Sequence, residues 1–404
     1  MRRLFGLFGA GLGGALLGVL VMVASQRVGS SDASDGAARQ PTTTTRPAKV
    51  APLPTARADV LLTWTPESLD PALGAAARAM PDVDAVSQVS AGITNLASSR
   101  DGDGAVVDRP DDGWYIPLDT IAIEPSDHAK FASVADRAAV SELGNGEALL
   151  GRTSAQLRRL DVGGTLRFSN GVTLTVTGIV EDATIGAAEL AVNRSTGAQL
   201  GVTNPRYLLV AHHSDRAAVE TALRSVLPGG APVRFRGQGE TPYLRQGDAV
   251  LPHVKMKERF GEFAYKPPAP GSGSRDFQQD PAWQSANLVT RTMPLVGRVT
   301  CHRAVADAIE GALTELAQAN LGNLVNPQDF AGCWNPRLVT AGGDLSHHAW
   351  GVALDINYQA NQTGRESVQD QRLVATFERW GFTWGGEWLV SDPAHFEYLQ
   401  PPRS

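Results

Sequence analysis

The chain has 404 residues, 42% of them hydrophobic, and a formal net charge of −6 at neutral pH. Because a single domain typically holds about 100 to 200 residues, this length predicts two domains plus tails. The mildly acidic net charge provides no broad basic surface, so nucleic acid is disfavoured as the main partner. Small polar molecules and peptides remain possible substrates.

The N-terminus combines two arginines with a long apolar segment. After Arg2 and Arg3, residues 4–24 carry no charge. At about 1.5 Å per residue, such a helix spans the roughly 30 Å hydrocarbon core of a bilayer. The arginines are expected to stay in the cytoplasm and to direct the rest of the chain outside. We therefore predict a signal anchor at 1–24 that gives the protein a single membrane span, with a cleaved signal peptide as the alternative.

A polar segment separates this anchor from the rest of the chain. Residues 25–57 are rich in Ser, Asp, Gly, Ala, Thr and Pro, and include four consecutive threonines at 42–45. A segment with so little apolar surface to bury is expected to be a disordered linker. Its expected role is to hold the folded part away from the membrane, through the cell wall.

Residues 58–239 are expected to form an α+β domain outside the cytoplasm. Two segments of this region each predict the order strand, helix, strand. The first comprises 59–65, 66–80 and 83–89, and the second comprises 207–213, 215–227 and 233–236. Two such units favour a ferredoxin-like layer. Between them, alternating residues on both sides of Asn170-Gly171 predict a β-hairpin.

Three short segments of this region follow a further pattern. Residues 148–152 read Ala-Leu-Leu-Gly-Arg, residues 160–165 read Leu-Asp-Val-Gly-Gly-Thr, and residues 175–180 read Thr-Val-Thr-Gly-Ile-Val. In these segments the chain resembles the periplasmic core domain of MacB/FtsX-type transporter permeases. Such permeases carry a four-helix membrane unit that this chain lacks, so the resemblance implies a binding or spacing domain rather than transport. A subunit associated with a transporter remains an alternative.

The chain contains two cysteines, Cys301 and Cys333. Outside the cytoplasm, such a pair forms a disulfide more often than two free thiols, so we predict a disulfide between them. Neither cysteine lies in a Cys-x-x-Cys spacing, so neither is expected to bind zinc.

Near the C-terminus, the segment from Gly351 to Tyr358 alternates in side-chain character and predicts a strand. Val352, Leu354 and Ile356 share one face, and Ala353, Asp355 and Asn357 share the other. Asp355 therefore projects among small residues. The break at Gly351 allows the preceding His348 to turn toward the same pocket.

A second segment has the same character. Asp392 before Pro393 favours a single helical turn, which would bring Asp392 and His395 to the same side. From His395 onward the residues alternate as a strand, with Phe396 facing the core. The two segments together offer two imidazoles and two carboxylates, which predicts a zinc site. Two histidines and one carboxylate, with a fourth position left for water, are typical of catalytic zinc, and a second carboxylate can accept the proton of that water.

The two segments also form a pair of spaced motifs. The first reads Ser-x-His-x-x-Gly-x-Ala-x-Asp over 346–355, and the second reads Trp-x(7)-Asp-x-x-His-Phe-Glu over 384–397. Over residues 251–398 the chain resembles the zinc D-alanyl-D-alanine carboxypeptidases, the VanY-like metallopeptidases, which also include L-alanyl-D-glutamate endopeptidases. The resemblance implies that His348, Asp355 and His395 are zinc ligands and that Asp392 is the general base. A helix cap is the alternative role for Asp392.

Two further residues match the family. Arg337 corresponds to an upstream arginine that would steady the substrate carboxylate or the developing oxyanion, with a structural salt bridge as the alternative. Ser346 corresponds to the motif serine and would either contact substrate or brace the loop. His347 is not expected to be a ligand, because its side chain should point away from that of His348. Glu397 is a candidate partner for a ligand histidine.

The sequence thus predicts an α+β protein with three folded parts. These are an N-terminal transmembrane anchor, a ferredoxin-like and β-hairpin middle domain at 58–239, and a C-terminal α+β zinc-peptidase domain with a small antiparallel sheet at 249–404. The expected function is a zinc-dependent peptidoglycan peptidase of the cell membrane, a D-alanyl-D-alanine carboxypeptidase acting on stem peptides. The alternatives are an L-alanyl-D-glutamate endopeptidase and an inactive protein that binds the cell wall or serves as a scaffold.

Overall fold

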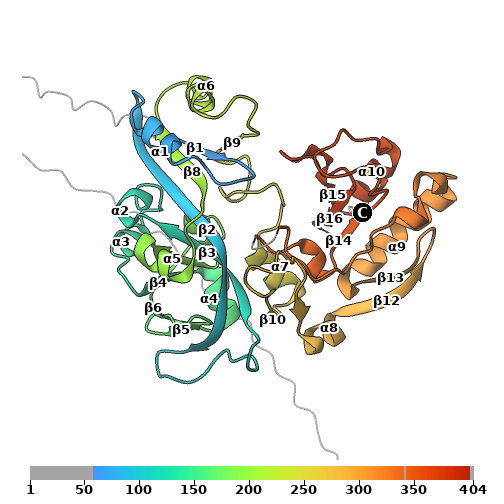
Figure 1. Ribbon diagram of the computed structural model, residues 1–404, viewed down its shortest axis with the longest axis horizontal. Helices are drawn as coiled ribbons and strands as arrows, with labels where there is room; N and C mark the ends of the chain where they lie inside the picture. The colour runs from blue at the N-terminus through green and yellow to red at the C-terminus, as the bar shows by residue number, and fades with distance from the viewer. Residues whose placement is uncertain (1–57, 341–342, 401–404) are drawn as a thin grey trace, which may run out of the picture. The chain divides into compact units, whose positions relative to one another are not determined.

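The computed structural model describes residues 58–340 and 343–400 (Figure 1). The predicted signal anchor at 1–24 and linker at 25–57 lie outside these residues. Within the described ranges, no helix has both the length and the apolar character needed to cross a bilayer. The predicted α+β class is confirmed, because the described chain contains both helices and sheets and only the pairs β3–β7 and β4–β6 among its paired strands are parallel.

The middle region is built on a nine-stranded sheet with the order β3-β7-β4-β6-β5-β2-β8-β1-β9. Its strands are β1 (Asp59–Trp64), β2 (Val83–Arg100), β3 (Ile116–Ile123), β4 (Glu147–Gly151), β5 (Thr165–Phe168), β6 (Thr173–Val180), β7 (Leu190–Asn193), β8 (Pro205–His212) and β9 (Arg234–Gly237). The helices between them are α1 (Pro71–Arg78), α2 (Pro125–His128), α3 (Arg137–Ser141), α4 (Arg152–Arg158), the 3-10 helix η1 (Asp182–Ile185), α5 (Arg194–Leu200) and α6 (Arg216–Val226).

The two predicted strand-helix-strand units interleave at one end of this sheet. Their strands lie in the order β9-β1-β8-β2, and all three pairings are antiparallel. The connecting helices α1 and α6 contact each other, as expected for a ferredoxin-like layer. Helix α1 begins at Pro71 rather than at the predicted position 66. Asp70 caps it by accepting a hydrogen bond from the backbone N–H of Ala72 at 2.8 Å, and proline suits the first helical position.

The predicted hairpin is confirmed, since β5 and β6 pair antiparallel on either side of Asn170-Gly171. Strand β2, in contrast, continues to Arg100, well beyond the predicted end at Val89. Its second half pairs with β3 and β5, and this pairing compensates for a composition of Ser, Ala, Gly and Asn that has little strand propensity of its own.

The C-terminal region contains smaller sheets around one long helix. Its elements are α7 (His253–Phe260), β10 (Tyr265–Lys266), β11 (Gln278–Gln279), α8 (Pro281–Asn287), β12 (Leu288–Met293), β13 (Gly297–His302), α9 (Arg303–Gln318), η2 (Gly322–Leu324), η3 (Pro327–Asp329), η4 (His347–Trp350), β14 (Ala353–Asp355), α10 (Gln371–Arg379), β15 (Phe382–Trp384), η5 (Gly385–Glu387) and β16 (His395–Tyr398). Strands β14, β16 and β15 form the small antiparallel sheet that the sequence predicts.

Each predicted region has its own hydrophobic core. The buried members of one cluster fall within 256–398, and those of three other clusters fall within 61–233. The described residues nevertheless belong to one compact unit, so the boundary between domains at 58–239 and 249–404 stays a prediction.

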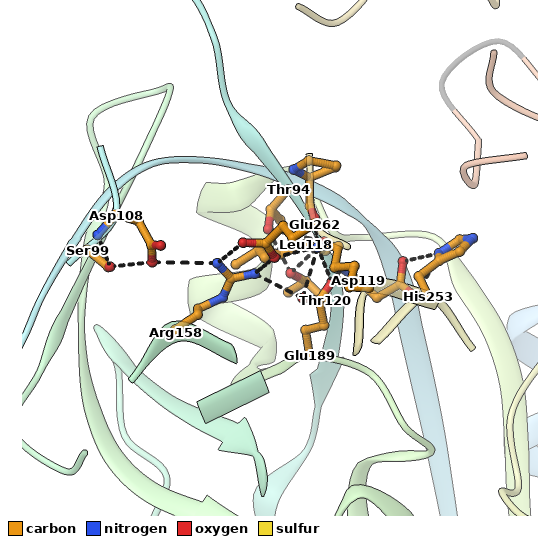
Figure 2. A network of polar contacts seen from close by, with 12 residues as sticks. Thr94, Ser99, Asp108, Leu118, Asp119, Thr120, Arg158, Glu189, His253 and Glu262 are labelled. Carbon is orange, nitrogen blue, oxygen red and sulfur yellow. Dashed lines mark hydrogen bonds and ion pairs between the residues drawn. The ribbon is translucent and has the colours of Figure 1, made fainter. Parts of the chain in front are cut away.

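A buried layer of charged groups joins the two regions (Figure 2). Glu189, just before β7, lies 3.0 Å from Nη2 of Arg158 on α4 and 2.8 Å from Nζ of Lys257 on α7. Glu262, just after α7, pairs with the same two cations. Breaking such a buried pair by removing one partner typically costs about 3 to 5 kcal/mol, because the other charge is left uncompensated. These groups therefore hold α7 firmly on the middle region.

Candidate metal centre and active site

Strands β14 and β16 bring Asp355 and His395 together. The two residues face each other directly in the antiparallel register, and the backbone N–H of Ile356 donates to the carbonyl of Ala394 at 2.9 Å. The neighbouring Leu354 and Phe396 are fully buried in the core. The predicted alternation is confirmed over β14, which spans only Ala353–Asp355 rather than the predicted 351–358, and it places the metal-binding candidates on one face and the apolar residues on the other.

His348 lies on the short helix η4. Ser346 caps this helix, and its hydroxyl accepts a hydrogen bond from the backbone N–H of His348 at 3.4 Å, which supports the loop-bracing role. Gly351 ends the helix with φ at +68°. A Cβ at Gly351 would lie 2.8 Å from the backbone nitrogen of His302. The turn that directs His348 toward β14 therefore requires glycine on both conformational and steric grounds.

Three side-chain atoms converge at this point. Nε2 of His348 lies 3.3 Å from Oδ1 of Asp355 and 3.3 Å from Nδ1 of His395, and the last two atoms are 2.9 Å apart. Ligand atoms about 2.0 to 2.1 Å from a tetrahedral zinc ion lie about 3.4 Å from one another. His348, Asp355 and His395 therefore fit zinc with little movement. In the described part of the chain, they form the one group of this kind.

The second nitrogen of each histidine has its own partner. Nδ1 of His348 donates to the backbone carbonyl of Cys333 at 3.0 Å, and Nε2 of His395 faces Oε1 of Glu397 at 3.4 Å. Such partners fix the tautomer of a ligand histidine and its orientation. When the rings are neutral, as metal binding requires, these partners take the N–H and leave the lone pairs of the two converging nitrogens for the metal. The other carboxylate oxygen of Glu397 binds Nδ1 of His347 at 3.1 Å, and His347 is not among the three residues whose ligand atoms converge.

The charges of the site shift its pKa values in opposite directions. Burial acts against the ionised form of Asp355, but His348 and His395 more than offset it and hold the pKa of Asp355 well below its usual range. Burial also opposes a charged His395, yet its hydrogen bonds to Asp355 and Glu397 raise its pKa to about 10. The pKa of Asp392 is raised by burial, with His395 opposing the shift and Asp355 adding to it.

Asp392, Arg337 and Ser346 share one cavity beside the metal-binding atoms. This cavity has a volume of about 280 Å³, and His395 and Glu397 also line it. Nη2 of Arg337 lies 3.8 Å from Oδ2 of Asp355. The turn at Asp392-Pro393 is confirmed, because the backbone N–H of His395 donates to the carbonyl of Asp392 at 3.0 Å. All the predicted site residues except the cysteines therefore meet at one place.

The predicted disulfide is wrong in this structure. Cys301 and Cys333 are both buried free thiols. The Cys333 thiol donates to the carbonyl of Gly351 at 2.9 Å, which turns its sulfur toward the η4 backbone. Burial, together with the neighbouring thiol of Cys301, raises the pKa of Cys333 well above its usual range, so the Cys333 thiol stays protonated in the core.

Further residues from three parts of the chain surround the site. The ring of Trp388 lies against His395, with 5.1 Å between ring centroids, and forms part of the cavity wall. Asp119 and Arg206 of the middle region and His253 of α7 also line the cavity. Asp119, Arg206 and His253 lie far along the chain from the metal-binding residues, so no local spacing pattern could have revealed their place in the cavity.

Comparison with known proteins gives partial matches. None of the curated proteins matches the chain. The periplasmic region of MacB from Actinobacillus actinomycetemcomitans is similar at 12% identity and a TM-score of 0.31, over 44% of this chain and 87% of that chain. The extracellular domain of the ABC-type transporter YknZ from Gram-positive bacteria is similar at 13% identity and a TM-score of 0.28, over 42% of this chain and 92% of that chain. At the C-terminus, residues 340–398 match the family model described as D-alanyl-D-alanine carboxypeptidase.

Proposed function

We propose that this protein is a zinc-dependent peptidase that removes the terminal D-alanine from stem peptides of peptidoglycan. The convergence of His348, Asp355 and His395, whose ligand atoms lie 2.9 to 3.3 Å apart, carries this proposal. Asp392 lies in the same cavity. The match of this segment to the carboxypeptidase family supports the same reaction.

His348, Asp355 and His395 would hold the metal, and a zinc ion supplies the Lewis acidity that activates water and polarises a peptide carbonyl. Asp392 then acts as general base and acid. It takes a proton from the attacking water and passes it to the nitrogen of the leaving amino acid. Its raised pKa suits this task, because a general base works best when its pKa approaches the operating pH.

Arg337 favours a carboxypeptidase over an endopeptidase. Its side chain is 19% exposed and faces the cavity. The separation of 3.8 Å from Asp355 is long for an ion pair, so the guanidinium keeps donors for a second carboxylate. A planar guanidinium matches a carboxylate through two parallel hydrogen bonds. We infer that Arg337 binds the C-terminal carboxylate of the substrate.

The N-terminal sequence supports a location outside the cytoplasm. The uncharged segment at 4–24 would anchor the protein in the membrane, and the linker at 25–57 would let the peptidase reach the cell wall. The substrate would then be peptidoglycan on the outer side of that membrane.

The test is to incubate the purified full-length protein, loaded with zinc, with a muropeptide that carries a pentapeptide stem. Release of D-alanine is the expected result, and His348→Ala should abolish it. Release of a longer peptide cut next to the sugar-linked L-alanine would identify an endopeptidase instead. Release of neither product would reject both activities and favour an inactive cell-wall binding protein.

A further inference from the structure

His253, the first residue of α7, connects the middle region to the loop that carries His348. Its Nδ1 lies 2.8 and 2.9 Å from the two carboxylate oxygens of Asp119 on β3, and its Nε2 lies 2.9 Å from the backbone carbonyl oxygen of Leu345. The residue is only 8% exposed. An ionised carboxylate and a carbonyl can only accept hydrogen bonds, so both ring nitrogens must donate and His253 is an imidazolium.

The ring also packs directly on η4. It stacks on Trp350, with 5.6 Å between ring centroids and an angle of 17° between the planes. It meets the ring of His347 edge-on at 5.7 Å. His253 therefore contacts Leu345 before η4, His347 in η4 and Trp350 at its end. Helix η4 is the one that carries His348.

Asp119 is itself held in place. Its backbone N–H donates to Oε2 of Glu189 at 3.1 Å, and Glu189 belongs to the buried charged layer with Lys257 (Figure 2). Lys257 lies four residues after His253, so both side chains project from the same side of α7. Figure 2 shows the carboxylate of Asp119 directed at the ring of His253. Helix α7 is therefore fixed on the middle sheet at two points, and neither end of the His253 bridge can move freely.

We propose that Asp119 and His253 are positioning residues for the metal site, so that the middle region takes part in metal binding. Asp119 fixes the ring of His253, and the ring fixes the carbonyl of Leu345 and the η4 helix. This inference depends on the proposed metal site. It gives the middle region a role in the same reaction, although none of its residues touches the metal.

The test is the zinc affinity of the full-length protein, measured by competition with a chelating indicator. Asp119→Asn keeps the size of the side chain but removes its charge. The two carboxylate oxygens that face the ring of His253 are then replaced by one oxygen and one amide N–H₂ group. We expect the affinity to fall about threefold to tenfold, less than the about 10- to 100-fold typical for direct partners of a ligand. The double variant Asp119→Asn/His253→Gln should bind zinc no more weakly than His253→Gln alone, because the two residues act as one unit.

Asp136→Asn is the matched control. Asp136 is a buried aspartate of the middle region, whereas the side chain of Asp119 is 24% exposed. The Asp136 carboxylate accepts hydrogen bonds from the backbone N–H of Glu181 at 3.2 Å and from the hydroxyl of Thr184 at 2.5 Å. This variant should lower the unfolding midpoint and leave the zinc affinity unchanged. An equal loss of zinc affinity in Asp119→Asn and Asp136→Asn would overturn the proposal, since general destabilisation would explain both.

The outcomes separate the two proposals. If the unaltered protein binds no zinc, the proposed metal site is wrong. If it binds zinc and Asp119→Asn binds zinc equally well, the metal site stands and the positioning role is wrong. Should Asp119→Asn fail to fold, His253→Gln provides the same test, because both N–H donors of the amide are on one nitrogen, whereas the imidazolium donates to Asp119 and Leu345 from two separate nitrogens. Unchanged zinc affinity in His253→Gln would then overturn the role.

Discussion

Replacing Glu397 with glutamine should weaken the metal site without removing a ligand. The Glu397 side chain is 6% exposed, and its two oxygens serve two histidines. Oε1 faces Nε2 of His395 at 3.4 Å, and Oε2 binds Nδ1 of His347 at 3.1 Å. Glutamine has the same shape but only one accepting oxygen, so it can satisfy only one of the two rings.

The size of the effect follows from these distances. Loss of a partner that orients a ligand histidine typically lowers metal affinity by about 10- to 100-fold, which corresponds to about 1.4 to 2.7 kcal/mol. The contact between Glu397 and His395 is long at 3.4 Å. The expected loss for Glu397→Gln is therefore near the lower limit, at about tenfold.

The assay is zinc competition against a chromophoric chelator at a temperature well below unfolding. Glu315→Gln serves as the control. Glu315 is 38% exposed and binds Arg379 and Trp380, neither of which is a candidate metal ligand, so its variant should keep the affinity of the unaltered protein. If Glu397→Gln also keeps that affinity, the orienting role of Glu397 is refuted.

Two further predictions concern Asp392 and the bridge between Asp119 and His253. Asp392→Asn leaves all three metal ligands in place, so zinc should still bind at one equivalent while the release of D-alanine falls by about 10²- to 10⁴-fold. Unchanged turnover at full zinc occupancy would show that another group is the base. For the bridge, burial disfavours both charges, but their mutual attraction lowers the pKa of Asp119 and raises that of His253. The contribution of Asp119 to the free energy of unfolding is lost as pH falls through its lowered pKa. The contribution of His253 is complete below about pH 6.5 and is lost as pH rises through its raised pKa. The difference in unfolding midpoint between the unaltered protein and Asp119→Asn should therefore be larger near about pH 6 than near about pH 9. Thermal denaturation in matched buffers measures this difference. A difference that does not change with pH would contradict the ion pair.

The local parts of the site could be predicted from the sequence because strand geometry is periodic. Alternation places the side chains of Asp355 and the apolar Leu354 on opposite faces of their strand, and it does the same for His395 and Phe396. Gly351 marks the turn that brings His348 to the same pocket. In each case the signal lies within ten residues, where backbone geometry alone decides which side chains share a face.

The long-range parts could not be predicted in this way. Asp119 and His253 are 134 residues apart, and each looks like an ordinary polar residue in its own segment. Strand β2 extends past Val89 because β3 and β5 pair with its polar half. The disulfide expectation for Cys301 and Cys333 came from redox compartment and cysteine number, which carry no information on where a sulfur points.

The register of β14 and β16 has a consequence for how the protein matures. Asp355 and His395 face each other in only one alignment of these strands. A slip by one residue would put Ala394 or Phe396 opposite Asp355 and turn the imidazole toward the core. Metal at a hundredfold excess over its dissociation constant would favour the correct alignment by about 2.7 kcal/mol. Binding of the ion would thus shift the folding equilibrium toward the sheet with the correct strand alignment.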